Sequence, residues 1–369
     1  MKIGYFVDPL HPAGTDYTEN IQNDLAQVAI LDDLGYAETW VAEHFTVAWE
    51  CIPSPEIFIA QALGMTKNMI FGTGVTCLPN HNPFHIAHRI AQLDHQAKGR
   101  FIWGIGSGAS PLDFKVFGVD VVKNEHRTLT RETLDMVLKI WSGLQPGTYE
   151  NKHWKFTMPE ANEELGFYVH MKPYQQPHPP IAVAGLSPKS ESLTLAGENG
   201  WIPISINYVP NRTLSTQWKT YSDAARIAGH SPKSTDWRIV RDVFVADTVK
   251  EAEDMAKTGV FARDFRYAHR ITKRLGLIDT MKIDPHTPDD AIDVDYMIEN
   301  SWIIGTPDQV EEKIRALYKE VGGFGTLIVM SHDWEPYDQW LHSMTLLAQE
   351  IMPRLADLTP SSHSSECST

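Results

Sequence analysis

The sequence predicts an α/β protein built as a single (β/α)8 TIM barrel, and three observations lead to this prediction. Eight short apolar runs alternate with longer amphipathic runs along the chain. Strands that alternate with helices pair in parallel through right-handed crossovers, which gives either a closed barrel or a doubly wound sheet. Eight such units over about 350 residues favour the barrel. The short runs are apolar on both faces, as buried parallel strands are.

The elements are predicted from these runs and from the residues that start helices. The expected strands are Lys2–Val7, Thr39–Val41, Ile70–Thr73, Phe101–Ile105, Ile181–Val183, Trp201–Ile204, Val240–Val245 and Thr326–Met330. The expected helices include Thr18–Leu34, Glu56–Met65, Phe84–Ala97, Thr128–Trp141 and Pro188–Glu198. Another helix is expected to begin at Pro307 with Thr306 as its N-cap, and Asn82 is placed to cap the helix that follows Pro83.

Two stretches interrupt the alternation, at residues 146–180 and 260–300. Both are expected to be insertions on barrel loops, and long loops in compact domains often act as lids or binding loops. The alternative is that they are solvated excursions without a role in binding. The barrel is expected to span residues 1–358, and the Ser-rich tail at 359–369 is expected to be disordered.

Composition and charge exclude several classes of partner. The net charge is -15 and no basic cluster is present, which argues against nucleic acid and anionic membrane surfaces as partners. No apolar run approaches the roughly 20 residues that a membrane span needs. The N-terminal run is expected to be a strand rather than a signal peptide. The three cysteines lack metal-site spacing and fit a reduced, cytoplasmic setting.

The most informative motif places Glu43 and His44 directly after the expected strand Thr39–Val41. Polar residues at the carboxyl ends of barrel strands are where this fold keeps its chemistry. The alternative is that the two side chains only satisfy backbone groups at the strand end. A second polar run follows the third strand, and its His81 is expected to face the strand ends as well.

Two turns of small residues suit the binding of a flat or anionic ligand. Gly104, Gly106 and Ala109 loosely satisfy the dinucleotide fingerprint, although no helix opens at once behind them. Small residues still let a backbone approach a ligand closely, while a purely structural bend is the alternative. The turn Ala184–Ser192 offers N–H groups, hydroxyls and a helix start to a phosphate, although ordinary serine capping explains part of this pattern.

The sequence does not indicate a metal site or a serine nucleophile. Among sixteen histidines there is no His-x-His at a strand end and no H-E-x-x-H, and the cysteines form no metal-binding pair. A G-x-S-x-G elbow is absent as well. We therefore expect chemistry that uses neither a catalytic metal nor an acyl-serine.

Together these segments resemble the bacterial luciferase-like flavin monooxygenases, from the N-terminus to about residue 355. The resemblance is carried by Glu43-His44-Phe45, Gly72-Thr73, Leu78-Pro79, Asn82-Pro83, Leu93-Asp94, Lys98-Gly99-Arg100-Phe101, Asp113-Phe114-Lys115-Val116-Phe117-Gly118 and Ile304-Gly305-Thr306-Pro307. Within the family, residues 48–56 and Met330-Ser331-His332-Asp333 look like the branch that acts on terpenoid ketones and limonene. That branch includes Baeyer–Villiger enzymes, the diketocamphane monooxygenases.

The resemblance implies a TIM barrel that binds reduced FMN, supplied by a separate flavin reductase, at the strand carboxyl ends, where O2 is captured as a C4a-peroxide. It implies that His44 is catalytic, with Glu43 orienting it, and that Gly74-Val75 forms a non-prolyl cis peptide under the flavin ring. The expected cofactor-binding residues are Thr73, Gly74, Val75, Ser107, Ala184, Gly185, Ser187 and Ser190. The expected substrate-binding residues are Trp49, His81 and Trp103.

One position departs from the family pattern. Ser107 stands where luciferases proper carry an arginine that binds the flavin phosphate, so light emission is not expected. The flavin phosphate must then be bound by Arg100, by Arg127 or by the backbone of the Ala184–Ser192 turn.

The function implied is a two-component FMN-dependent monooxygenase that oxygenates a small hydrophobic molecule with O2, by Baeyer–Villiger oxidation of a terpenoid-like ketone. The two insertions are expected to act as lids. The alternatives are alkene epoxidation or hydroxylation by the same flavin chemistry, hydride transfer with deazaflavin F420, and a non-catalytic flavin-binding subunit. A homodimer is expected by analogy alone. The substrate, its regiochemistry and the reductase are not indicated by the sequence.

Overall fold

The computed structural model describes residues 1–333 and 335–358, so the predicted disordered tail at 359–369 lies outside the described residues. Eight strands form a closed, parallel barrel in the order β3-β2-β1-β13-β10-β9-β8-β5, and a pairing between β3 and β5 completes the ring. They are β1 Lys2–Val7, β2 Glu38–Val41, β3 Ile70–Thr73, β5 Phe101–Gly106, β8 Ile181–Gly185, β9 Ile202–Ser205, β10 Arg238–Arg241 and β13 Thr326–Met330. The predicted fold class is confirmed.

The register of the barrel is parallel where neighbouring strands meet. Lys2 of β1 lies opposite Thr326 of β13, and Phe71 of β3 lies opposite Phe101 of β5. The remaining strands are β4 Thr76–Cys77, which pairs with β5, the hairpin β6 Gly147–Glu150 and β7 Lys155–Met158, and the pair β11 Val243–Val245 and β12 Ile303–Gly305.

Helices separate the strands along the chain. They are α1 Tyr17–Asp33, α2 Pro55–Leu63, α3 Pro83–Ala97, α4 Pro111–Val116, α5 Glu125–Ser142, α6 Glu191–Asn199, α7 Asn211–Ile227, α8 Val249–Thr258, α9 Val260–Arg274, α10 Val294–Asn300, α11 Pro307–Val321, α12 Tyr337–Leu346 and α13 Met352–Arg354. In the described part of the chain, no helix combines the length and the apolar character that crossing a membrane requires.

By their internal contacts the residues fall into two compact units. The first unit comprises Met1–Leu10, Ile30–Thr39 and the chain from Val183 onward, and the second unit comprises His11–Ala29 and Trp40–Ala182. The assignment of residues 1–358 to one domain stays a prediction.

Local signals account for the helix starts. The Asn82 side chain caps α3 by accepting from the N–H groups of Phe84 (3.0 Å) and His85 (3.3 Å). At the start of α11 the Gln309 side chain accepts from the Thr306 N–H at 3.1 Å, with Pro307 in the first helical position. Both predicted caps are confirmed.

All eight predicted strands are present, but the run Val240–Val245 is not one strand. It divides at Asp242 into β10, which belongs to the barrel, and β11, which pairs with β12 instead. The Asp242 carboxylate accepts from Asn207 (2.7 Å) and from His332 (2.9 Å), which fixes the chain at this point. The charged residues Arg241 and Asp242 in the middle of this run mark the division in the sequence, whereas the partners of Asp242 lie far away in the chain.

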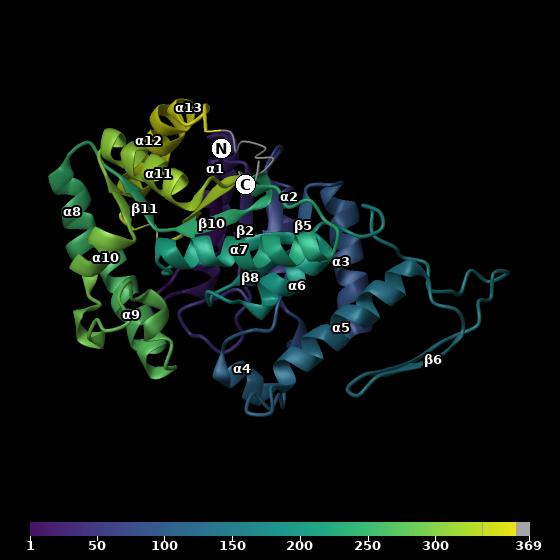
Figure 1. Ribbon diagram of the computed structural model, residues 1–369. Helices are drawn as coiled ribbons and strands as arrows, with labels where there is room; N and C mark the ends of the chain where they lie inside the picture. The colour runs from purple at the N-terminus through teal and green to yellow at the C-terminus, as the bar shows by residue number, and fades with distance from the viewer. Residues whose placement is uncertain (334, 359–369) are drawn as a thin grey trace, which may run out of the picture. The chain divides into compact units, whose positions relative to one another are not determined.

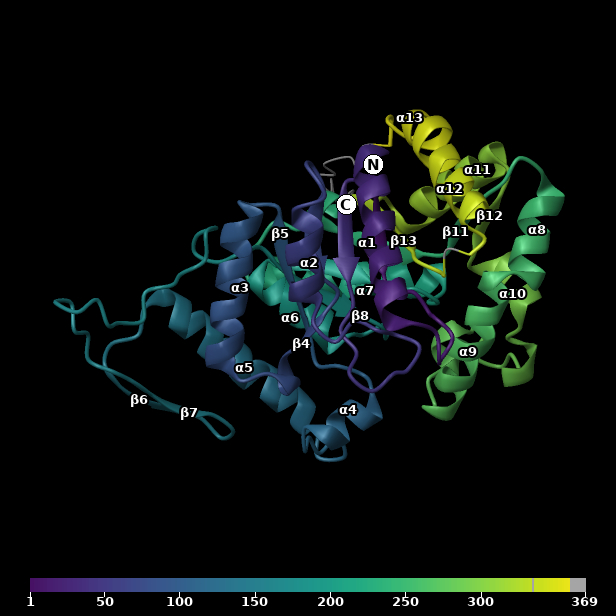
Figure 2. The same cartoon turned by 180° about the vertical axis from the view of Figure 1, so that it is seen from behind.

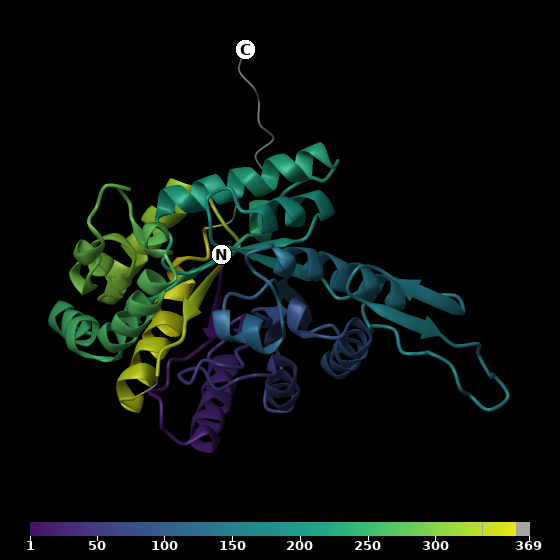
Figure 3. The same ribbon diagram turned by 90° about the horizontal axis from the view of Figure 1, so that it is seen from below.

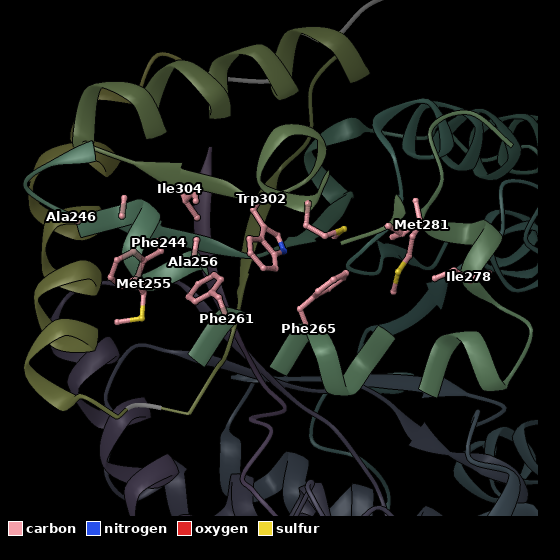
Figure 4. Packing of buried hydrophobic residues seen from close by; sticks show 13 residues of the cluster. Phe244, Ala246, Met255, Ala256, Phe261, Phe265, Ile278, Met281, Trp302 and Ile304 are labelled. Atoms are coloured by element: carbon pink, nitrogen blue, oxygen red, sulfur yellow. The ribbon is translucent and has the colours of Figure 1, made fainter. Parts of the chain in front are cut away.

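The predicted insertion at 260–300 is largely helical and lies in the first unit. It contains α9 and α10, which lie beside α8 and β11 in Figure 1. Its apolar side chains have a core of their own, in which Phe261, Phe265 and Trp302 pack edge to face with ring centroids 5.5 and 5.7 Å apart (Figure 4). This excursion is therefore a packed substructure and not a solvated loop.

The predicted insertion at 146–180 lies in the second unit and begins with the hairpin β6–β7. Its turn is held to α5, since His153 bonds to Glu132 (2.8 Å) and to Glu125 (3.2 Å). The stretch that follows the hairpin extends beyond α3 and α5 in Figures 1 and 2, and the view from below in Figure 3 agrees. The end of the insertion returns to the amino end of β5, where Gln175 Nε2 donates to the Phe101 carbonyl (2.9 Å). The hairpin turn thus reaches the start of α5, and the lid role of the stretch stays a prediction.

Candidate active site

His44 lies directly after β2, on the loop that leads to α2. The loop closes on itself, because the His44 N–H donates to the Ile52 carbonyl (3.1 Å) and the Glu50 N–H donates to the Val47 carbonyl (3.0 Å). This brings the Glu50 carboxylate to 2.9 Å from His44 Nε2, with side chains that are 14% and 27% exposed. A carboxylate at this distance stabilises the charged imidazolium form of the ring. The loop therefore holds a reachable histidine at a strand end, as proton exchange with a ligand requires.

Glu43 is buried and binds a different histidine. Its Oε2 lies 2.9 Å from His81 Nε2, and its Oε1 accepts from the Cys77 N–H at 3.3 Å. Arg89 Nη2 lies 2.9 Å from His81 Nδ1. A guanidinium only donates, so Nδ1 must accept and the His81 ring is neutral, with its proton on Nε2 toward Glu43.

This arrangement corrects two expectations about the site. Glu43 orients His81 rather than His44, whose carboxylate partner is Glu50. His81 is buried with both ring nitrogens engaged, so it supports the segment after β4 instead of offering a ring nitrogen to a substrate. A catalytic role for Glu43 stays a prediction.

The loop that carries His44 is also attached to α4. Thr46 Oγ1 donates to the Asp113 carboxylate and lies 3.1 Å from Ser110 Oγ, while the Phe45 N–H donates to Asp113 at 3.4 Å. The Phe45 ring meets Phe117 edge to face at 5.2 Å. Asp113 is itself buried in the first turn of α4. It fixes the loop at Phe45 and Thr46, the two residues that follow His44.

A group of small residues, Thr73–Val75 with Gly104 and Gly106, packs closely where β3 and β5 meet, and we name it the ledge. The peptide bond between Gly74 and Val75 is cis, which confirms the prediction made from the resemblance. A Cβ atom on Gly104 would come within 1.8 Å of the Thr73 carbonyl oxygen, and one on Gly106 within 2.5 Å of Val75 Cγ2. The Thr73 hydroxyl donates to the Gly104 carbonyl at 2.7 Å. Only glycines on β5 allow this close approach, and the ledge suits a planar ring system.

The structure separates the three candidates for binding a phosphate. Arg100 stands at the amino end of β5, and its guanidinium donates to the carbonyls of Met69 (3.0 Å) and Leu63 (3.3 Å), so it caps α2 and is not placed for a ligand at the strand carboxyl ends. Arg127 is exposed on α5, and its role stays a prediction. Ser107 follows β5 and accepts from the Thr130 hydroxyl at 2.9 Å, so this serine is held by α5.

The turn after β8, in the first unit, is the third candidate. Gln217 of α7 is buried, and its Nε2 lies 3.2, 3.0 and 3.2 Å from the carbonyl oxygens of Gly185, Leu186 and Ser187. Ser190 caps α6 by accepting from the Leu193 N–H at 3.4 Å. The carbonyls of the turn thus point to Gln217. The turn leads into the amino end of α6, and the positive end of the helix dipole there suits an anion.

The predicted substrate contacts differ in their surroundings. Trp103 has no exposed surface, its Nε1 donates to the Thr76 hydroxyl (3.1 Å) and its ring packs edge to face on Trp141 at 5.1 Å. It is therefore a core residue of the second unit and not a wall for a ligand. Trp49 is half-buried on the His44 loop, and its contact with a substrate stays a prediction.

One group of possible metal ligands occurs within the second unit. The ligand atoms of His11, Asp24 and Cys51 all lie within 4.8 Å of one another. His11 Nε2 is 3.2 Å from the Asp24 carboxylate, which pairs the two in the usual way of buried polar groups. Burial, together with the charge of Asp24, raises the pKa of Cys51 to about 12, so the thiol is protonated at neutral pH. The expectation that the site uses no metal stays a prediction.

Sequence reasoning missed the residues that hold the site. Glu50 carried a weak signal, because an acid on the same short loop as His44 is a natural partner. Arg89 lies eight residues after His81 and gave no pairing signal of its own. Asp113 belongs to a segment that carries the resemblance, but it acts on a loop that is distant in the sequence. Such pairings depend on how the strands are placed, which a single sequence does not reveal.

Comparison with known proteins agrees with this geometry. Residues 1–324 match the model of the luciferase-like monooxygenase family. The chain is 33% identical to 3,6-diketocamphane 1,6-monooxygenase of Pseudomonas putida, over 96% of this chain and 98% of that protein. It is 32% identical to limonene 1,2-monooxygenase of Rhodococcus erythropolis, over 98% of this chain and 88% of that protein.

A solved structure gives the same picture. The oxygenating constituent of the Pseudomonas putida 3,6-diketocamphane monooxygenase, described as a type II Baeyer–Villiger monooxygenase in complex with FMN, superimposes with a TM-score of 0.88. That comparison covers 96% of this chain and 98% of the other, at 33% identity. The chain therefore belongs to the luciferase-like monooxygenase family.

Proposed function

We propose that this protein is the oxygenating component of a two-component, FMN-dependent monooxygenase, and that it converts a terpenoid-like ketone into a lactone by Baeyer–Villiger oxidation. The observation that carries the proposal is His44, held at a strand end by Glu50, in a chain 33% identical over nearly its whole length to a ketone-oxidising relative. We thereby extend the substrate class of that relative, a ketone, to this chain.

The residues present fit FMN. The ledge Thr73–Val75 offers a flat surface to an isoalloxazine ring, because Gly104 and Gly106 leave no side chain beneath it. Ser107 stands next to it in the same unit, at the end of β5. The turn with Ala184, Gly185, Ser187 and Ser190, at the start of α6, has the N–H groups and dipole that a phosphate needs.

When bound, reduced FMN supplies the two electrons with which O2 is activated. In the balanced reaction one oxygen atom enters the ketone, the other leaves as water, and FMNH2 becomes FMN. His44 gives or takes a proton near the reacting oxygen, and Glu50 stabilises the charged form of its ring. Asp113 and Thr46 hold the loop in place, and the Phe45 ring packs on the Phe117 ring beside it.

A separate flavin reductase is part of this proposal. The structural relative is an oxygenating constituent, and a protein of that kind receives its reduced flavin from another component. The partner would therefore be a reductase that transfers FMNH2, and the association need only be transient. A homodimer remains part of the proposal by analogy.

Oxygenation of an alkene is a second candidate function. It is favoured by the 32% identity to limonene 1,2-monooxygenase, whose substrate is a monoterpene with carbon–carbon double bonds and no ketone. The same two electrons and the same O2 would then yield an epoxide or an alcohol in place of a lactone, with the second oxygen atom again leaving as water.

The test is O2 uptake with product analysis, using FMNH2 from a flavin reductase and a panel of bicyclic ketones together with limonene. We expect substrate-dependent O2 uptake and a lactone from at least one ketone. An oxygenated limonene product without lactones would favour the second candidate. Uptake that yields only H2O2 with every compound would reject both substrate classes, and binding of F420 in place of FMN would reject the cofactor.

A further inference from the structure

His332 follows β13, and its ring is engaged on all sides. Its Nδ1 lies 2.9 Å from an Asp264 oxygen, and its Nε2 lies 2.9 Å from an Asp242 oxygen. The ring stacks on Phe261 with centroids 4.0 Å apart and planes inclined by 26°. Both carboxylates are fully buried, and the histidine is 7% exposed. The interaction thus takes place away from water, where each of these contacts is strong.

The hydrogen bonds define the charge of the ring. A carboxylate accepts only, and a neutral imidazole has one N–H, so two bonds to two carboxylates require an imidazolium. Each carboxylate has a second donor that favours its ionised form. Asn207 donates to Asp242 at 2.7 Å, and Arg263 Nε donates to Asp264 at 2.8 Å.

The pKa of His332 agrees with this assignment. Burial alone lowers the pKa, but the hydrogen bonds and charges of Asp242 and Asp264 outweigh it and raise the pKa to about 9. Arg263 and Asp333 also face the cluster and pair with each other at 3.1 Å. The buried guanidinium of Arg241 interacts with the charge of Asp242, and Glu335 lines the same cavity as His332. The ring is therefore charged throughout the neutral range.

The cluster joins α9 to the carboxyl ends of the barrel strands. Asp242 follows β10, His332 follows β13, and Asp264 lies in the second turn of α9. Arg263 extends the attachment by donating to the carbonyl of Leu10, after β1, at 3.1 Å. Because β1, β13 and β10 are neighbours in the sheet, one end of α9 is fixed over three adjacent strand ends.

The buried apolar core around α9 is local to the excursion, while Tyr208 after β9 and the stacking of Phe261 on His332 add contacts toward the barrel. Every buried member of the core around α9 lies between Phe244 and Ile304, as Figure 4 shows for Phe261, Phe265 and Trp302. This core holds the excursion from β11 to β12 together. The polar cluster of His332, Asp242, Asp264 and Arg263, which we name the clamp, is what ties the excursion to the ends of β10 and β13.

We propose that His332 is a positioning residue whose imidazolium clamps the start of α9 onto the carboxyl ends of β10 and β13, and that loss of one ring proton releases this helix. The neutral ring can donate to only one of the two carboxylates, and the other is left buried beside a bare nitrogen lone pair. The catalytic consequence, entry of water and loss of product, rests on the proposed function. The release of α9 itself is independent of the proposed function.

The experiment is hydrogen–deuterium exchange of the full-length protein between pH 6 and 10, read as the ratio of exchange in α9 to exchange in α11. The ratio cancels the intrinsic rise of exchange with pH. For the wild type we expect the ratio to be flat at neutral pH and to rise with a midpoint near pH 9. For His332→Gln it should already be higher at pH 7, by at least about tenfold, and show no step.

Two further variants sharpen the test. His342→Gln is the matched control, because His342 pairs with Asp247 at 3.0 Å but is 50% exposed, and its ratio should equal that of the wild type. Asp264→Asn keeps the shape and removes one charge, so its step should move to lower pH, which also keeps the test usable if His332→Gln does not fold. A wild type without a step, or His332→Gln with wild-type protection of α9, would overturn the proposal.

Activity gives a separate readout. Where O2 uptake is coupled to a product, the product formed per O2 consumed should fall over the same pH interval as the exchange step. If no oxygenated product is found while the exchange step is present, the proposed function fails and the clamp stands. If product is formed and the exchange step is missing, the clamp fails and the proposed function stands.

Discussion

His44 lies on a short loop that is fixed at three points: by its own backbone, by Glu50 and, through Thr46, by Asp113. Proton exchange at a reacting oxygen needs a ring that stays in one orientation, because small displacements of a catalytic group cost much of the rate. A loop that is anchored in this way gives the histidine a defined position although it belongs to no strand or helix. Such a loop would keep the exposed edge of the ring in place for the proton exchange that we propose.

Replacing His44 by Gln should lower product formation by about 10²- to 10⁴-fold, since the variant loses its proton donor and acceptor. FMN binding should stay within a few-fold of the wild type, and H2O2 should rise in place of product. His85→Gln, on the exposed side of α3, is the control and should behave as the wild type. Glu50→Gln should cause a smaller loss that disappears in the His44→Gln background. Unchanged product formation in His44→Gln would contradict its catalytic role.

The protonation state of His81 can be tested through stability. Glu43 accepts from both the His81 Nε2–H and the Cys77 N–H, so in Glu43→Gln one of these donors faces the amide NH2 in place of an oxygen. His81 Nδ1 must meanwhile keep accepting from Arg89. We expect a loss of about 1–3 kcal/mol in the free energy of unfolding, measured with urea. Arg89→Met should relieve part of this loss in the double variant, because the ring can then move its proton to Nδ1. Additive losses would show that the ring is not locked in this tautomer.

At the scale of elements, β3 and β5 are placed so closely that glycine is required between them. Gly104→Ala would put a Cβ 1.8 Å from the Thr73 carbonyl oxygen, and this backbone atom cannot turn aside. We expect a loss of stability of about 1–3 kcal/mol or more, with FMN binding lost as well. Gly64→Ala, whose nearest neighbour is the Gln61 carbonyl at 3.4 Å, is the control and should be close to neutral. Equal stability of the two variants would refute the ledge as described.

The same scale shows what the sequence can and cannot predict. The eight barrel strands are visible because each is a short apolar run next to turn residues, and the caps Asn82 and Thr306 mark where their helices begin. The division of the seventh run is marked by its charged residues Arg241 and Asp242. The partners of Asp242, which are Asn207 and His332, are not visible, because they lie far away in the chain. Likewise, Glu43 next to His44 in the chain suggested a pair, whereas the fold gives each a different partner.

At the scale of the whole molecule, His332 links the fold to pH. Its folded-state pKa is raised from the ordinary 6.5 to about 9, because Asp242 and Asp264 outweigh the effect of burial. A raised histidine pKa contributes stability that is complete below pH 6.5 and is lost as the pH rises through 9. The loss attributable to this group is on the order of 3 kcal/mol.

We therefore expect the urea midpoint of unfolding to fall between pH 6.5 and 9 in the wild type, and to fall much less in His332→Gln. Circular dichroism during urea titration at several pH values measures this directly. Because the chain contains two compact units, the midpoints of separate transitions should be compared if more than one is seen. Parallel pH profiles of the two proteins would mean that His332 does not carry this dependence.

The central claim is that the protein transfers one oxygen atom from O2 to a ketone with electrons from reduced FMN. The most direct measurement is mass spectrometry of the product formed under ¹⁸O2 with FMNH2 and a bicyclic terpenoid ketone. The account predicts a lactone that carries one ¹⁸O atom in the new ring position, with the second labelled atom released as water. A lactone without label, or ¹⁸O found only in H2O2 while the ketone is recovered unchanged, would contradict it.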